Sequence, residues 1–146
     1  YHYRMTDIHA ALAFSQMDRL DHYVEKRKKI AQIYSEKLQG LPLTLPAISQ
    51  ECSSSWHLYV VRLRLKKIRK SHRDVFDAMR KTGIGVNLHY IPVHYHPYYE
   101  KLGFKKDSFP EAEQYYREAI TLPLFPALTD EQVNYICNTL KEVLVT

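Results

Sequence analysis

The sequence has few glycines and cysteines and lacks any long apolar run. With only four glycines in 146 residues, it contains no glycine-rich loop of the kind that cradles phosphates. The two cysteines, Cys52 and Cys137, are far apart and belong to no CxxC pair, which argues against a disulfide framework. A reducing compartment, the cytoplasm, is the expected location. No apolar stretch approaches the length that crosses a membrane, so no membrane partner is expected.

Motifs for metal binding and for nucleophilic catalysis are also missing. No Ser-His-Asp or Cys-His arrangement can be assigned, and no helix carries an HExxH pair. His94 and His96 are one residue apart and His89 lies five residues before His94, but no acidic residue or cysteine stands among them. Metal sites usually combine such ligands, so we expect no metal.

The charge balance mildly favours an anionic partner. The chain has 21 basic and 16 acidic residues, a net charge of +5, which suits nucleic acid, phosphates or sugar nucleotides. The run EKRKK (25–29) lies on a predicted amphipathic helix, where a solvated face is the preferred interpretation. A free-standing module that binds nucleic acid or another polyanion stays open as an alternative, supported by twelve tyrosines. Because the basic residues are scattered over helix faces, we do not expect nucleic acid as a partner.

The order of the predicted elements favours an α+β fold. A long helix is predicted over 6–39, with a break near Leu20, and Gly40 ends it. Strands are predicted at 56–65, 84–91 and 120–126. Further helices begin at the capping boxes SHRD (71–74) and SFPE (108–111), after Pro97, and at TDEQ (129–132). We therefore expect a small three-stranded sheet covered on one face by helices and preceded by the broken N-terminal helix.

The stretch IGVNLHYIPVHYHPYYEKLGF (84–104) carries the candidate binding residues. On a strand, Asn87 and His89 would share one face, and His94 would follow on the loop beyond Pro92. Tyrosine and histidine offer hydrogen-bond donors and flat apolar faces, which suit a sugar or a nucleobase. Tyr98 and Tyr99 are expected to anchor a short helix on the core, and Trp56 is expected to be a packed residue.

Several motifs together resemble the C-terminal part of the DegT/DnrJ/StrS sugar aminotransferases. They are YHYRMTDIHAALAFSQMDRLD, SSWHLYVVRL, GIGVNLHYIPVHYHPYYEKLGF and FPEAEQYYREAITLPLFPALTDEQV. The branch that looks most similar aminates a UDP-linked 4-keto-6-deoxy sugar on the way to pseudaminic acid. The resemblance implies the fold of aspartate aminotransferase (fold type I), the cofactor pyridoxal 5′-phosphate (PLP), glutamate as amino donor and a homodimer. It also implies that 1–40 joins a large domain to a C-terminal small domain, 41–146.

The resemblance implies roles for individual residues. YHYRM is similar to the family motif GYNYRM, so His2 replaces the asparagine that reaches the PLP phosphate across the dimer, and Arg4 matches the motif arginine. HYIPVH is similar to the segment that approaches the sugar nucleotide. The substrate-binding candidates are therefore Asn87, His89, Tyr90 and His94.

No catalytic residue is assigned within this sequence. The family's Schiff-base lysine is expected upstream of Tyr1, and no lysine here stands in a matching motif. The resemblance therefore predicts a fragment that is inactive and binds no PLP by itself. An alternative within the family is a PLP-dependent dehydratase, in which a histidine replaces that lysine.

Overall fold

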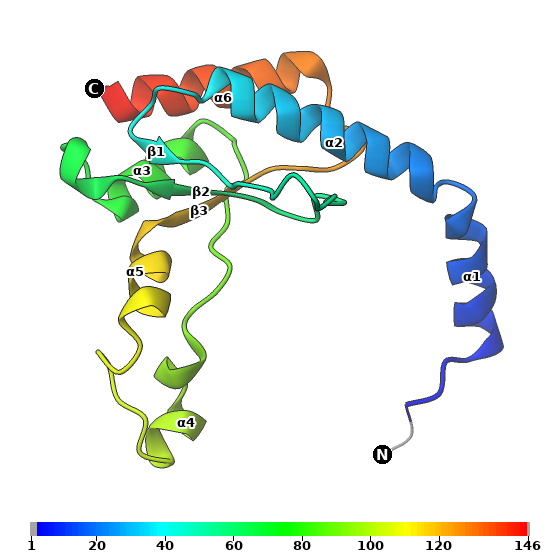
Figure 1. The fold of residues 1–146 in the computed structure, drawn as a ribbon, viewed down its shortest axis with the longest axis horizontal. Helices are drawn as coiled ribbons and strands as arrows, with labels where there is room; N and C mark the ends of the chain where they lie inside the picture. Colours follow the sequence, from blue (N-terminus) through cyan, green and yellow to red (C-terminus); the bar gives the residue numbers. More distant parts are fainter. Residues whose placement is uncertain (1–2, 146) are drawn as a thin grey trace.

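The fold begins with two consecutive helices that lie at different angles (Figure 1). The computed structural model describes residues 3–145. Helix α1 (Asp7–Met17) and helix α2 (Leu20–Lys37) are separated by two residues, which confirms the predicted break. Thr6 caps α1, where its hydroxyl accepts the backbone N–H of His9. The break lets α2 follow the sheet while α1 extends away from it.

Three short antiparallel strands form one sheet in the order β1-β2-β3. They are β1 (Leu43–Thr44), β2 (Tyr59–Leu63) and β3 (Ala119–Leu122). Leu43 pairs with Leu63, and Val61 pairs with Ile120. Burial alternates along β2 because successive side chains of a strand point to opposite faces. The sheet therefore has one fully apolar face and one half-polar face.

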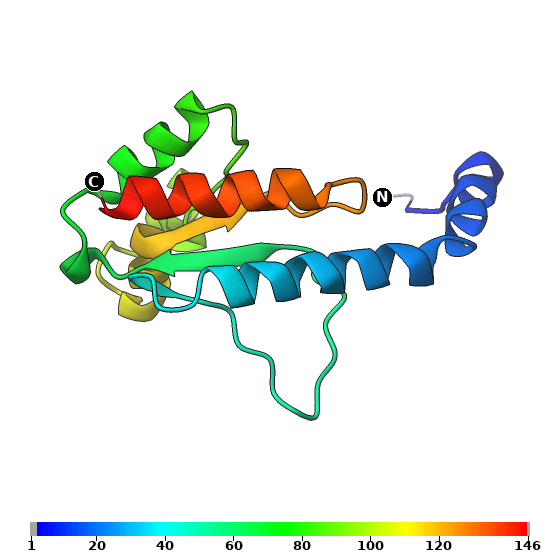
Figure 2. The ribbon, with the colours of Figure 1, turned by 90° about the horizontal axis from the view of Figure 1, so that it is seen from above.

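Helices cover the apolar face of the sheet. Helices α2 and α6 (Asp130–Val145) run side by side over it, and α3 (His72–Lys81) packs beside α6 (Figures 1 and 2). The expected α+β class is therefore confirmed. On the other face, α5 (Pro110–Glu118) lies against β2. The core side chains on α6 are Val133, Ile136, Cys137, Leu140 and Leu144.

The predicted strand at 84–91 is wrong in extent. Only Asn87 forms a β-bridge, with Thr121, and no ladder continues on either side. The ladder stops because the backbone of Ala119, which would pair next with His89, is already bonded: its carbonyl accepts from His72 and its N–H donates to Tyr115. The third strand of the sheet is instead β1. The predicted strand at 56–65 shortens to β2, because Trp56 has a positive φ of 52° and Leu65–Lys67 forms a 3₁₀ turn.

The predicted helix starts are mostly confirmed. Ser71 and Asp74 form a reciprocal capping box at α3, and Gly83 follows the helix with a φ of +82°. The capping box predicted at SFPE is wrong, because Pro110 is the first helical residue and Phe109 occupies the cap position without a side-chain bond. A short helix, α4 (Pro97–Lys101), follows Pro97 as predicted.

The tyrosine pair on α4 does not pack on the core, in contrast to the prediction. Tyr98 is 68% exposed and Tyr99 is 37% exposed, and their rings contact each other at 5.3 Å. Helix α4 extends beyond the sheet, so no core surface lies within its reach (Figure 1). Trp56 is partly buried against the core beside Tyr59, as predicted.

Helix α2 is part of the hydrophobic core, whereas α1 is not. Ile30, Ala31, Tyr34 and Leu38 of the α2 region are buried, but α1 has no buried residue. The division into 1–40 and 41–146 stays a prediction. Within residues 3–145, no helix is both long and apolar enough to cross a bilayer. In the same residues, no three metal-ligating side chains come together.

Candidate functional site

The candidate segment leaves the core at Val86 and is held by β3. Ile84 and Val86 are buried, which fixes the start of the segment against the helices. Asn87 then exchanges two backbone hydrogen bonds with Thr121 of β3, at 2.8 and 3.1 Å. Ile120 and Leu122, the neighbours of Thr121, are core residues. The backbone at Asn87 is therefore as firmly placed as the sheet itself.

The side chains of Asn87, His89 and Thr121 form a short hydrogen-bonded chain. The oxygen of Asn87 accepts the Leu88 N–H at 2.8 Å, so its Nδ2 is the donor toward His89 Nε2 at 3.3 Å. Nε2 of His89 then acts as acceptor, and Nδ1–H donates to the Thr121 hydroxyl at 2.8 Å. This network selects one tautomer of a neutral imidazole. Two of the four predicted substrate-binding residues are thus brought together.

Tyr90 follows directly and points a free aromatic surface away from the core. It is 73% exposed, and its ring meets that of His89 edge-on at 4.6 Å. An exposed tyrosine beside an ordered imidazole offers a flat face and a phenolic hydroxyl to a ligand. Tyr90 therefore adjoins the pair formed by Asn87 and His89.

His94 lies in a different, buried environment. Its side chain is only 7% exposed, and its Nε2–H donates to Glu113 Oε1 at 2.9 Å. The ring of Phe109 lies 4.8 Å away. Burial raises the pKa of Glu113, but hydrogen bonds from His94, Tyr95 and two backbone N–H groups outweigh it and lower that pKa overall. Glu113 is therefore an ionised carboxylate, and a substrate contact of His94 stays a prediction.

The two predicted cofactor-binding residues lie at the N-terminal end. His2 is outside the residues that the structure describes. Arg4 is exposed in the extended segment before α1, and it has no hydrogen bond or ion pair with residues 3–145. Its guanidinium is available for an external anion, and its planar donors match a phosphate.

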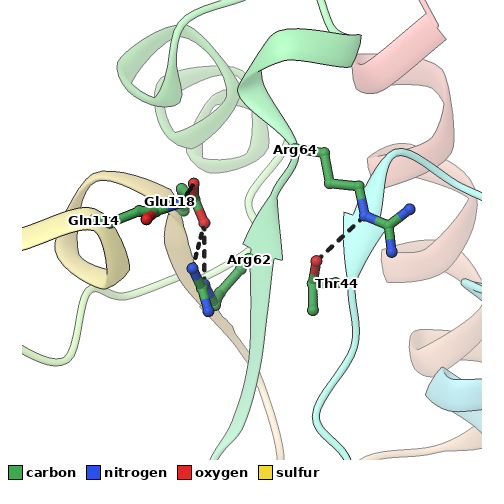
Figure 3. A network of polar contacts seen from close by, with 5 residues as sticks. All are labelled: Thr44, Arg62, Arg64, Gln114 and Glu118. Atoms are coloured by element: carbon green, nitrogen blue, oxygen red, sulfur yellow. Dashed lines mark hydrogen bonds and ion pairs between the residues drawn. The ribbon is translucent and has the colours of Figure 1, made fainter. Parts of the chain in front are cut away.

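Several basic residues that could suggest a polyanion surface are used within the fold. Arg62 donates two hydrogen bonds to Glu118, which also accepts from Gln114, and Arg64 donates to Thr44 (Figure 3). Arg27, in the run EKRKK, donates to three backbone carbonyls, those of Trp56, His57 and Leu124, at 2.9–3.2 Å. Part of this run thus joins α2 to the ends of β2 and β3, whereas the sequence suggested a solvated face.

Sequence reasoning did not identify Thr121 and Glu113 as part of the site. Thr121 is a buried polar residue in an otherwise apolar strand, AITL, and that exception was the available signal. Glu113 lies in the first half of α5 among other acidic residues, and nothing local distinguishes it from them. Both act on partners that are distant in sequence.

Comparison with known proteins identifies the family. The protein-family model for the DegT/DnrJ/EryC1/StrS aminotransferase family matches residues 1–141. The chain belongs to this family. The fold described above is accordingly that of the small domain of these fold-type-I enzymes, and solved members superpose on it closely.

Three relatives show how similar this chain is to other proteins. The spore coat polysaccharide biosynthesis protein SpsC of Bacillus subtilis is 35% identical over 147 residues, covering 99% of this chain. Spr1654 from Streptococcus pneumoniae, described as a sugar aminotransferase, is 34% identical over 97% of the chain with a TM-score of 0.88. It has been solved in apo, PMP and PLP forms. Helicobacter pylori PseC, an aminotransferase of pseudaminic acid biosynthesis, is 25% identical over 99% of the chain with a TM-score of 0.89.

The match covers only part of each relative. This DegT-family chain spans 38% of SpsC, 36% of Spr1654 and 39% of PseC. Each of these relatives therefore contains a large further region that this chain does not cover.

Proposed function

We propose that this domain belongs to a PLP-dependent aminotransferase that transfers an amino group from glutamate to a nucleotide-linked keto sugar. In this proposal, the domain supplies sugar contacts, a lid and part of a homodimer interface. The observation that carries the proposal is the family match over residues 1–141, together with sugar-aminotransferase relatives solved with PLP and PMP. Residues outside 1–146 would provide the lysine that binds PLP, so the isolated domain would be inactive.

The hydrogen-bonded chain of Asn87, His89 and Thr121 supports a role in sugar binding. It presents ordered polar groups at the edge of the sheet, and Tyr90 beside it presents an aromatic face. Sugars combine hydroxyl groups with an apolar ring face, so they are recognised by this combination of side chains. The order imposed by Thr121 reduces the conformational cost of binding.

Arg4 fits a contact with the phosphate of PLP. It is an exposed, unpaired guanidinium within the part of the chain that the structure describes, and its fork of donors matches phosphate oxygens. PLP, when bound, supplies an electron sink and carries the amino group between the two substrates. The contribution of this chain would be to hold the phosphate and to orient the sugar.

We propose a UDP-linked 4-keto-6-deoxy sugar as the first substrate to test. The motifs taken together suggested the pseudaminic acid branch, and PseC is among the structures that superpose on the chain. Its 25% identity is below the 34–35% of Spr1654 and SpsC, so the identities give this branch no preference. A panel of nucleotide-linked keto sugars is therefore required.

The test uses the full-length protein with PLP. We expect an absorbance band of lysine-bound PLP and conversion of the keto sugar with stoichiometric consumption of glutamate. The absence of this band would contradict the proposal. Dehydration of a 3-hydroxy sugar without glutamate consumption would indicate the dehydratase instead. The isolated 146-residue chain should give no band, and a stoichiometric band from it would refute its predicted inactivity.

A single substitution connects that assay to the site. His89→Ala removes both bonds of the imidazole, and we expect the KM for the sugar nucleotide to rise about tenfold. The half-reaction with glutamate should be unchanged, because the substitution leaves the cofactor contacts in place. An unchanged KM for the sugar would show that His89 does not contact it.

A further inference from the structure

A long excursion of the chain between the candidate site and α5 has almost no core of its own. We name residues 90–109 the arm; it leaves the sheet after His89, carries α4 at its far end and returns to α5 (Figure 1). Within the arm only Pro92 and His94 are buried. Large apolar side chains remain exposed along it, among them Ile91, Val93, Tyr98 and Leu102. Contacts other than core packing must therefore set the orientation of the arm.

One buried carboxylate connects both halves of the arm to α5. Glu113 is 1% exposed and accepts the Nε2–H of His94, in the outgoing half, at 2.9 Å. It also accepts the backbone N–H of Phe109, in the returning half, at 3.4 Å, and Tyr95 and the backbone of Asp107 contribute to lowering its pKa. A buried charge held by donors from both halves has a restricted geometry, because each lost bond leaves a desolvated group unpaired.

We propose that Glu113 and His94 are positioning residues, which hold the arm against α5 and thereby place Tyr90 at the sugar-nucleotide site. This inference rests on the proposed function of the segment. Neither residue needs to touch the substrate: Glu113 acts through His94, and His94 acts through the backbone that leads back to Tyr90.

The geometry explains why the pair affects Tyr90 in particular. Tyr90 lies between two fixed points, the His89–Thr121 hydrogen bond before it and the His94–Glu113 bond after it. With both bonds present, the backbone of 90–93 is constrained at each end. Without the second bond, Tyr90 is constrained only from the sheet side. Binding groups must be held to within about half an ångström to be effective, so this loss should weaken substrate binding.

Helix α5 provides a matched control. Glu118 lies on the same helix and also accepts close charged hydrogen bonds, from Arg62 at 2.8 and 3.0 Å, but its partner is on β2 (Figure 3). Glu118→Gln therefore disturbs α5 and its attachment to the sheet without changing a hydrogen bond of the arm. Glu113→Gln keeps the size of the side chain and removes the charge that its donors share.

The experiment measures steady-state kinetics of the full-length protein. For Glu113→Gln we expect the KM for the sugar nucleotide to rise about tenfold, with the glutamate half-reaction and the lysine-bound PLP band unchanged. Glu118→Gln should keep the KM within about twofold of the unsubstituted protein. Equal changes of KM in both variants, or an unchanged KM in Glu113→Gln, would overturn the proposal. His94→Gln changes the other partner of the His94–Glu113 hydrogen bond and should raise the KM for the sugar nucleotide in the same way.

A second measurement does not depend on the reaction. Lys101, Lys105 and Lys106 are exposed tryptic sites in the outer part of the arm. We expect trypsin to cut the full-length Glu113→Gln protein in the arm at least about tenfold faster than the Glu118→Gln protein. If the arm is released but no keto sugar is converted even by the unsubstituted protein, the proposed function fails and the positioning of the arm stands. If cleavage is equal in both variants, the positioning role is refuted whatever the substrate.

Discussion

Replacing the buried Cys137 by alanine should destabilise the folded chain at neutral pH and stabilise it at high pH. The Cys137 thiol lies on α6, is 3% exposed, and burial raises its pKa from 9.0 to about 11. An unfolded thiol ionises near pH 9, whereas the folded chain keeps the proton, so stability is complete below pH 9 and is lost as pH rises toward 11. One pH unit in this window is worth about 1.4 kcal/mol, so the unsubstituted chain should lose about 2 kcal/mol by pH 10.5 through this group.

Cys137→Ala removes that loss at the cost of a small cavity. At pH 7 the variant should be less stable by about 1 kcal/mol, a typical value for a small core truncation. At pH 10.5 it should be more stable than the unsubstituted chain by about 1 kcal/mol, the difference between the two effects. Tyr34 and Tyr59, whose pKa values burial also raises, titrate in both proteins and largely cancel in the comparison.

The assay is urea denaturation of the 146-residue chain at pH 7 and pH 10.5. Far-UV circular dichroism is the suitable signal, because ionised tyrosines quench tryptophan fluorescence at the higher pH. Cys52→Ala is the matched control: this cysteine is exposed, so its substitution should change stability by less than about 0.5 kcal/mol at either pH. A stability difference for Cys137→Ala that is the same at both pH values would refute the reasoning.

Two further predictions concern the core and its polar connections. Arg27→Met removes the donor of three backbone carbonyls and should destabilise the chain by about 2 kcal/mol in urea denaturation; an effect below about 0.5 kcal/mol would show that water replaces the guanidinium. Leu140→Ala, at a fully buried position of α6, should cost about 3 kcal/mol in the same assay. Leu102→Ala, an exposed leucine on the arm, is its control and should cost less than about 0.5 kcal/mol; equal losses would contradict the assigned core.

Local sequence signals predicted most helices and failed where pairing is distant. Ser71 with Asp74, and Gly83 after the helix, specify both ends of α3 within a dozen residues. Strand β1 has only two residues, and it is a strand because Leu43 meets Leu63, twenty residues away. The opposite error occurred at 84–91, where apolar alternation suggested a strand, but the backbone of Ala119, the next partner on β3, is bonded to His72 and Tyr115 instead. Competition from residues distant in the sequence leaves no periodic signal.

The sequence predicted residues that can contact a sugar, and it did not predict the groups that hold those residues in place. Asn87 and His89 were identified from their place in the segment, and the structure brings them together. Their partner Thr121 lies 32 residues from His89, and Glu113 lies 19 residues from His94. A sequence pattern shows which side chains can bind a sugar. It does not show which buried group, brought close by the fold, holds each of them.

The two partners hold the site in different ways, and this difference bears on how the site would work. Thr121 belongs to β3, between the core residues Ile120 and Leu122, so Asn87 and His89 can move only if the sheet moves. Glu113 holds an arm that is otherwise mostly exposed through hydrogen bonds, and the ring contact between Tyr95 and Tyr116 adds to this attachment. Local opening has the lowest free-energy cost where few apolar contacts must break. The sheet side of the site should therefore be the fixed part and the arm the adjustable part, with Tyr90 at the boundary between them.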